Sequence, residues 1–348
     1  MTETALHAHL AARGAVHRDD RGVVVPAHFG DPAAEYAALV HGMAIVDLGF
    51  RTLVAATGPD RVDFLQGMLT NDVGRLAPGS GCVALLLTIQ GRVVADVRVA
   101  ALDDELRLDV DTRVHDPFVD ALSRLIIADD VELATPEPAM ALVGVEGPGA
   151  TALLGPEAAT LDAFAHRELD VGGRRVRLVA GGELGARSFT LHVPVADVTC
   201  VWDALAAGGA VACGMEALEA RRVELGVPRI GVDMDEKTLA IELPVEALIS
   251  TTKGCYLGQE VVARGTSRGH TNRRLRALVL DGPLPPAGAA LVADDKEVGR
   301  LTTVVHAFGL GHPAALGLVR REHWEPGTTL AVAGASTTTA RVADWPLA

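Results

Sequence analysis

The last quarter of the chain is the part whose fold the sequence constrains most. Six short β-like runs recur there, and Pro or Gly punctuation separates them. The runs cover 274–280, 289–292, 298–306, 315–319, 329–332 and 340–342. Short runs at this spacing, with turn residues between them, are typical of the strands of a small barrel. The sequence therefore predicts a C-terminal antiparallel β-barrel over 270–348.

The preceding part of the chain alternates strand-like and helix-like runs and repeats one pattern. In each half an apolar run, 54–57 or 141–145, stops at a Gly-Pro pair, and a short helix follows. Aligning Gly58 with Gly147 places Leu154 over Leu65, an offset of 89 residues. Two similar halves predict a pseudo-symmetric pair of α/β domains, 1–135 and 136–265, with a crevice that suits a small ligand. The predicted fold class is α+β.

Composition excludes several classes of protein. A hydrophobic fraction of 49% with 22% charged residues excludes an intrinsically disordered chain. The formal charge of −14 and an aromatic content of 3% argue against direct nucleic-acid binding. Because no secretory leader or apolar run of about 18 residues is visible, we expect a cytoplasmic protein without a membrane partner. Four cysteines without a C-x-x-C pair argue against a permanently bound metal.

The segment 253–260, which reads KGCYLGQE, carries the strongest chemical signal. Lys253 lies two residues before Cys255, and a predicted helix begins just after, at Gly258. A cation and a helix N-terminus both favour a thiolate over a thiol, so Cys255 is a candidate reactive cysteine. The alternative interpretation is a turn whose cysteine and Tyr256 simply pack inward.

Two acidic residues occupy positions that need an explanation. Glu224 falls in the last turn of a predicted helix, where the helix dipole disfavours a carboxylate. It either pairs with Arg221 or accepts hydrogen bonds from a ligand with adjacent N–H donors, such as a pterin. Asp96 lies inside an apolar strand, and a buried carboxylate needs a partner or a task.

Five arginines follow the 253–260 segment in a stretch that holds no acid between Val261 and Leu280. This local charge of +5 inside a chain of −14 is either a solvated face or an anion site. The arginines are Arg264, Arg268, Arg273, Arg274 and Arg276.

The chain resembles the YgfZ-type folate-binding proteins, a branch of the superfamily that includes the aminomethyltransferase (T-protein) of glycine cleavage. The resemblance rests first on KGCYLGQE and on its continuation to Arg264 and through Arg268-Gly269-His270. It extends over nearly the whole chain, through the motifs at 57–61, 64–67, 70–73, 91–96, 222–229 and 298–302.

The resemblance implies two ferredoxin-like α/β domains around a central cavity that holds tetrahydrofolate or a one-carbon derivative, followed by the barrel. It further implies a role in the assembly, maintenance or repair of iron–sulfur enzymes, including tRNA-modifying radical-SAM enzymes, and in oxidative-stress tolerance. The partners would then be folate and iron–sulfur client enzymes or assembly proteins.

Site residues carry over by position. Cys255 matches the signature cysteine with Lys253 beside it, and Glu224 matches the glutamate that holds the pterin ring. Asp96 falls where the transferases carry an Asp-Asp pair, which here reads Ala95-Asp96, so one carboxylate is missing. We expect catalytic roles for Cys255, Lys253 and Asp96. Folate contacts are expected from Glu224, Asp96, Asn71, Arg229, Tyr256, Gln259 and Arg264.

Three functions compete at this point. The first is a folate-binding accessory factor for iron–sulfur enzymes, in which Cys255 acts as a thiol. The second is a tetrahydrofolate-dependent aminomethyltransferase or demethylase, in which Asp96 supplies acid–base chemistry. The third is a folate-sensing interaction scaffold without catalysis. In any of them the arginine-rich segment is predicted to attract the anionic glutamate tail of folate.

Overall fold

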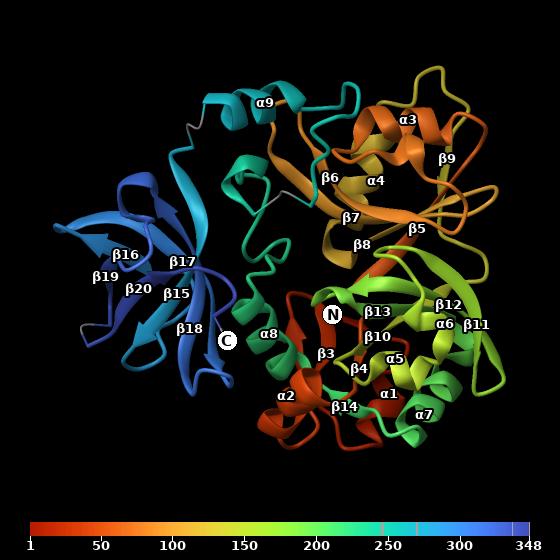
Figure 1. The fold of residues 1–348 in the computed structure, drawn as a ribbon, viewed down its shortest axis with the longest axis horizontal. Coiled ribbons are helices and arrows are strands. Elements are labelled where there is room, and N and C mark those ends of the chain that lie inside the picture. The colour runs from red at the N-terminus through yellow and green to blue at the C-terminus, as the bar shows by residue number, and fades with distance from the viewer. Residues whose placement is uncertain (245–246, 269–270, 336, 348) are drawn as a thin grey trace. The chain divides into compact units, whose positions relative to one another are not determined.

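The computed structural model describes residues 1–244, 247–268, 271–335 and 337–347; the side chains of 186–187 and 266–268 are not described. The chain, drawn in Figure 1, folds into two compact units. The first unit contains Met1–Leu87, Val94–Leu218 and Ala247–Leu257, and the second contains Thr88–Val93, Glu219–Glu246 and Gly258–Ala348. The three domain boundaries expected from sequence stay a prediction.

A five-stranded sheet in the first unit positions Asp96. Its order is β6 (Gly81–Leu87), β7 (Val93–Ala101), β8 (Leu106–Asp111), β5 (Arg51–Thr57) and β9 (Glu132–Ala134). Ala95 and Val97 of β7 join a core with helices α3 (Arg61–Met68) and α4 (His115–Ser123). Because side chains alternate along a strand, Asp96 and Arg98 project from the opposite face.

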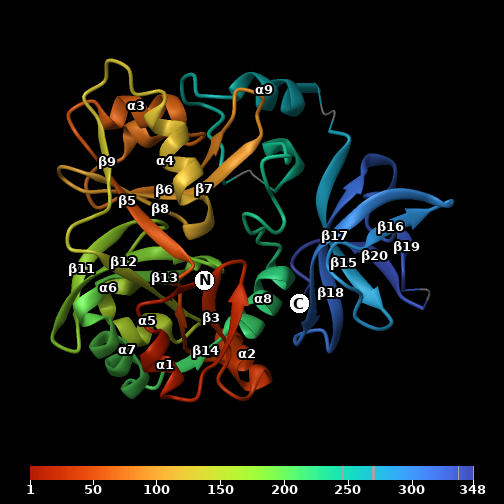
Figure 2. The same ribbon diagram turned by 180° about the vertical axis from the view of Figure 1, so that it is seen from behind.

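A six-stranded sheet forms a second part of the scaffold of this unit, which also contains a three-stranded sheet within residues 2–28. Its order is β11 (His166–Val171), β12 (Arg174–Gly182), β13 (Gly185–Pro194), β10 (Met140–Glu146), β4 (Ala44–Asp47) and β14 (Val211–Cys213). Its core includes residues of α1 (His7–Ala11), α5 (Ala150–Leu154), α6 (Pro156–Ala159) and α7 (Val198–Ala207), which gather by this sheet (Figures 1 and 2). Strand β4 comes from the first predicted domain but pairs with β10, so the two sheets are not built from separate sequence halves.

The first 43 residues form elements that sequence analysis did not assign. They are β1 (Thr2–Glu3), β2 (Val16–Asp20), β3 (Val23–His28) and α2 (Pro32–His41), in addition to α1. Helix α2 begins where it does because the Asp31 carboxylate accepts hydrogen bonds from the amides of Ala33 and Ala34, and Pro32 fits the first turn.

The Gly-Pro repeat has a clear structural basis. Gly58 ends β5 with φ of 94°, and Gly147 follows β10 with φ of 92°. A Cβ at Gly58 would collide with the carbonyl oxygen of Asp130, and one at Gly147 would lie 2.6 Å from that of Gly42. Both turns therefore need glycine for its backbone conformation and for the close approach of another segment.

The second unit contains the closed barrel, with the strand order β15-β18-β17-β16-β19-β20. The strands are β15 (Arg273–Asp281), β16 (Ala290–Ala293), β17 (Lys296–Ala307), β18 (His312–Arg320), β19 (Thr329–Val332) and β20 (Thr339–Ala343), and all neighbours are antiparallel. Each predicted run corresponds to one strand, so the barrel and the α+β class are confirmed. Helices α8 (Met215–Leu225) and α9 (Gln259–Arg268) precede it, and no described helix is long and apolar enough to span a membrane.

Candidate functional site

The Lys253 ammonium group is bound to the end of helix α3. Its Nζ donates hydrogen bonds to the carbonyl oxygens of Gln66 at 2.6 Å, Leu69 at 2.6 Å and Asn71 at 2.8 Å. Helix C-termini leave carbonyls without helical partners, and an ammonium group has three protons to offer. Burial lowers the pKa of Lys253 to about 8, although Asp72 opposes the shift, so the group keeps its charge at neutral pH.

Further hydrogen bonds attach the residues around Lys253 to the end of α3 and to the turn that follows it. The Leu257 amide donates to the Gly67 carbonyl at 3.0 Å, and the Ser250 amide donates to that of Thr70 at 3.0 Å. The Thr70 hydroxyl donates to the Leu248 carbonyl at 2.6 Å. The structure thus brings together the 64–73 motifs and the signature segment, which are far apart in sequence.

This anchoring leaves Cys255 exposed at the surface of the loop. The neighbouring Tyr256 is half-buried, and its ring centroid lies 5.4 Å from the Lys253 Nζ. Of the two interpretations of the segment, the inward-packed turn therefore fits Tyr256, whereas the cysteine faces solvent. The Lys253 ammonium group donates to carbonyls at and just after the end of α3, and so fixes the loop that carries Cys255.

The Asn71 side chain shapes the turn that follows α3. Its Nδ2 donates to the carbonyl oxygens of Val83 at 2.7 Å and Ala247 at 3.3 Å, and its Oδ1 accepts a bond from the Asp72 amide at 2.9 Å. Asn71 is therefore a structural neighbour of Lys253 in this unit. Its predicted folate contact stays a prediction.

Asp96 belongs to a separate network of buried charges in the first unit. Arg51 Nη1 donates to Asp96 Oδ2 at 3.2 Å, and Arg51 Nε donates to Asp109 Oδ1 at 2.6 Å. Arg98 joins by donating to Asp109 Oδ2 at 3.3 Å and to Glu183 Oε1 at 2.6 Å. Burial opposes the charge of Arg51, but the surrounding carboxylates outweigh it and raise its pKa.

One oxygen of Asp96 remains available in this network. The Asp96 side chain is 22% exposed, yet its Oδ1 atom is buried and has no hydrogen-bond partner. A buried oxygen without a partner costs free energy unless a ligand or water supplies a proton. Sequence analysis found Asp96 as a charge in an apolar strand, and the same signal in β5 and β8 marks Arg51 and Asp109, which it missed.

Glu146 is a second buried carboxyl near this network. Its side chain is enclosed, and Oε1 has no hydrogen-bond partner. Burial, and next the charge of Glu183, raises the pKa of Glu146 well above its ordinary value. The protonated form of this carboxyl is therefore favoured relative to an exposed glutamate.

In the second unit, Glu224 of α8 is fully enclosed, with 0% of its side chain exposed. Its Oε2 accepts a hydrogen bond from Arg221 Nη1 at 3.1 Å, and its Oε1 accepts one from the Gly309 amide at 3.0 Å. Of the two alternatives for Glu224, the Arg221 pair is present. The predicted contact with a pterin remains to be tested.

Gln259 and Arg264 both belong to helix α9, whereas Arg229 lies in the loop after α8 in the same unit. Arg229 is buried and donates from Nη1 to Glu219 Oε1 at 2.9 Å. Gln259 is the first residue of α9, and Arg264 pairs with Glu260 on the exposed surface of that helix.

Two arginines of the arginine-rich segment pair with acids from elsewhere in the second unit. Arg273 pairs with Glu242 at 2.9 Å, and Arg276 pairs with Asp344 at 3.0 Å. Arg274 lies 4.8 Å from the ring centroid of Trp324, a distance typical of a cation–π contact. The Arg268 side chain and His270, both part of the predicted motif, lie outside the described residues.

Family models match most of the chain. The GCVT N-terminal domain matches residues 6–253, and the glycine cleavage T-protein C-terminal barrel domain matches residues 273–347. The chain belongs to the glycine cleavage T-protein family. The two matches cover the candidate residues from Asn71 to Lys253 and the barrel.

Individual members of the T-protein family match this chain along most of its length. The aminomethyltransferase of Saccharopolyspora erythraea is 27% identical over 342 residues, which cover 95% of this chain and 93% of that protein. That of Thermus thermophilus is 29% identical over 310 residues, or 87% of each chain. The crystal structure of aminomethyltransferase T from Bartonella henselae has a TM-score of 0.90 at 19% identity, covers 100% of this chain and 98% of its own, and supports the T-protein fold.

Within this T-protein-family chain the predicted site residues form separate groups. Lys253, Asn71 and Tyr256 lie together, whereas Asp96 lies in the Arg51 network of the five-stranded sheet. The described residues also contain no cluster of three or more His, Cys, Asp or Glu side chains that suits a metal ion.

Proposed function

We propose that the chain binds tetrahydrofolate or a one-carbon derivative and, as a YgfZ-type member of its family, serves the maintenance of iron–sulfur enzymes. Membership of the T-protein family supports the folate ligand. The observation that carries the finer part is the exposed Cys255 thiol, held on a loop that Lys253 fixes to α3.

Asp96 is the residue of the first unit that best suits the folate. Its unpartnered Oδ1 is an acceptor for an N–H group, and Arg51 holds the other oxygen in place. Folate supplies ring nitrogens that carry and release one-carbon groups. The protein would orient such a nitrogen through Asp96 Oδ1 and hold or return a proton there.

The thiol role of Cys255 is tested by complementation. In a strain that lacks the protein, we expect Cys255→Ala to bind tetrahydrofolate as the wild type does but to leave iron–sulfur enzyme activity unrestored. Cys200→Ala is a matched control, because Cys200 is also exposed in the first unit. Full restoration by Cys255→Ala would exclude the thiol role.

A tetrahydrofolate-dependent aminomethyltransferase or demethylase is the second candidate, and two observations favour it. Relatives that match most of the chain include aminomethyltransferases, and Asp96 keeps a buried oxygen without a partner, although the resemblance gives the transferases a second aspartate where this chain has Ala95. A single positioned carboxylate is sufficient to accept or donate a proton to a reacting amine.

This candidate is tested by turnover. Incubation with tetrahydrofolate and a panel of methylamine-type donors is expected to give methylene- or methyl-folate, and Asp96→Asn is expected to abolish the product. Asp104→Asn, a change at an exposed acid of the same unit, is the control. The absence of product with every donor counts against the candidate.

The third function, an interaction scaffold without catalysis, has a different signature. It is favoured if calorimetry shows no folate binding while complementation is intact.

A further inference from the structure

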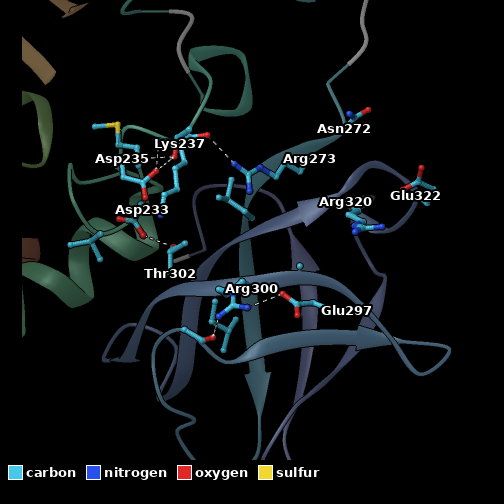
Figure 3. A pocket seen from close by; sticks show the side chains of 17 residues that line it. Asp233, Asp235, Lys237, Asn272, Arg273, Glu297, Arg300, Thr302, Arg320 and Glu322 are labelled. Carbon is cyan, nitrogen blue, oxygen red and sulfur yellow. Dashed lines mark hydrogen bonds and ion pairs between the residues drawn. The ribbon is translucent and has the colours of Figure 1, made fainter. Parts of the chain in front are cut away.

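A cavity of about 930 Å³ lies within the second unit, between the 232–238 loop and the barrel (Figure 3). Its volume is within the range of about 300–1,000 Å³ that is usual for small-molecule sites. None of the expected catalytic or folate-contacting residues lines it, although Arg273 of the arginine-rich segment and Gly299, Arg300, Leu301 and Thr302 of the 298–302 motif do. It is therefore distinct from the Asp96 and Cys255 regions.

The loop wall of this cavity is fixed to the barrel by Asp233, whose side chain is fully enclosed. Asp233 Oδ1 accepts hydrogen bonds from the hydroxyls of Thr302 at 2.5 Å and Thr303 at 2.7 Å. Its Oδ2 accepts one from Arg222 Nη1 at 2.7 Å. Because both carboxylate oxygens are occupied, Asp233 is a structural element of the wall.

The next turn of the loop is also held in one conformation. Asp235 Oδ1 accepts bonds from the Lys237 amide at 2.9 Å and the Thr238 hydroxyl at 3.0 Å. The Lys237 carbonyl in turn accepts a bond from Arg273 Nη2 at 3.3 Å. A ligand that binds here would find the wall already ordered, which lowers the entropic cost of binding.

Eight charged side chains line the cavity, and half of them have ion-pair partners. Asp233 pairs with Arg222, Arg273 pairs with Glu242, and Arg300 pairs with Glu297. Two cations, Lys237 and Arg320, and two acids, Asp235 and Glu322, have no ion pair within the part of the chain that the structure describes.

The four unpaired groups form two sets. Figure 3 shows Lys237 and Asp235 on one side of the cavity, and Arg320 and Glu322 on the other, where the Asn272 amide also lies. A simple anion would meet an acid without an ion-pair partner on either side. A ligand with one negative and one positive end satisfies both sets, and a carboxamide such as that of Asn272 both donates to and accepts from peptide groups.

We propose that this cavity binds a short zwitterionic peptide. One end of the peptide would place its carboxylate against Lys237 or Arg320, and the other its ammonium group against Glu322 or Asp235. The available volume suits several residues, whereas a single inorganic ion would leave most of it empty. This proposal does not depend on folate binding.

The experiment uses three probes of one size with the full chain. They are tri-alanine, N-acetyl-tri-alanine and tri-alanine amide, titrated by calorimetry and by NMR. Each capped peptide lacks one charge, and a charge-assisted hydrogen bond contributes on the order of 1.5–3 kcal/mol, so we expect tri-alanine to bind roughly tenfold or more tightly than either. Added salt is expected to weaken this preference.

Protein variants identify the charge that is recognised. In Lys237→Gln with Arg320→Gln, tri-alanine is expected to bind about tenfold more weakly, while the affinity for the amide, which has no carboxylate, stays unchanged. Arg341→Gln is the matched control, because Arg341 is exposed on the barrel but does not line the cavity. Glu322→Gln is expected to weaken binding of tri-alanine but not of N-acetyl-tri-alanine, which has no ammonium group. Glu236→Gln is its control.

Several results would overturn the proposal. They are the absence of binding by all three peptides, equal binding of free and capped peptides, or an equal loss in the Arg341→Gln and Glu236→Gln controls. Binding of the acetylated peptide alone would replace it with a plain anion site.

Discussion

Buried charges in the first unit meet because three strands of one sheet present polar residues on the same side. Arg51 of β5 contacts Asp96 of β7 and Asp109 of β8, although it is 45 positions from the first and 58 from the second in sequence. Each charge alone would be costly to bury, and the network compensates them jointly. These two partners of Arg51 come from other strands of the same sheet.

Removal of Arg51 is expected to be strongly destabilising. Arg51→Met leaves Asp96 and Asp109 without their shared cation, which costs about 3–5 kcal/mol of the free energy of unfolding. Arg175→Met removes an exposed pair with Glu168 and is expected to cost at most about 1 kcal/mol. Urea unfolding of both variants measures the difference; equal losses would contradict a buried network.

Glu146 makes stability depend on pH in a defined direction. Its pKa is raised in the folded chain by burial and by Glu183, so the folded state holds a proton that the unfolded state releases. The free energy of unfolding therefore falls as the pH rises above the ordinary glutamate value, and it does so until the raised pKa is reached.

Glu146→Gln removes this titration. We expect the variant to be more stable than the wild type at about pH 8, with the advantage disappearing toward about pH 4, as judged by urea midpoints across that range. Glu132→Gln, a change at an exposed position of the same unit, should leave the pH profile unaltered. A wild-type profile retained in Glu146→Gln would show that another group is responsible.

At the scale of elements, the 247–257 segment is held in place by helix α3. The bonds from Lys253, Ser250 and Leu257 all reach the stretch from Gln66 to Asn71. The conformation of the Cys255 loop thus depends on carbonyl groups nearly two hundred residues earlier, which end a helix and need donors.

Lys253→Met tests this dependence. Three carbonyls lose their donor, and we expect a loss of about 1–3 kcal/mol in the free energy of unfolding together with faster alkylation of Cys255. Lys296→Met, at an exposed lysine of the barrel, is the control. A stable variant with unchanged alkylation would mean that the loop does not need the ammonium group.

At the scale of the whole chain, part of the arginine-rich stretch is paired with acids from other parts of the second unit. The acid-free arginine stretch stood out against a total of −14, but Arg273 and Arg276 meet Glu242 and Asp344 in the second unit. A cation that is already paired attracts a distant anion weakly, because the two charges of the pair cancel beyond a few ångströms.

The structure therefore revises the expectation for the folate tail. We now expect mono- and polyglutamylated tetrahydrofolate to bind with affinities that differ by less than about tenfold and that respond little to salt. Calorimetric titrations of both forms at low and high salt decide this. A steep salt dependence for the polyglutamylated form alone would restore the arginine segment as a tail site.

The sequence by itself determined the local pattern of this protein. The six barrel strands, the Gly-Pro turns and the conspicuous positions of Asp96, Glu224 and Lys253 are visible in it, because periodicity, turn chemistry and misplaced charge are properties of short stretches. The tertiary structure alone decided that β4 joins the second sheet, that Lys253 binds the end of α3, and that Arg51 accompanies Asp96. Those pairings join residues far apart in the chain, and no local pattern records which of many possible partners burial will bring together.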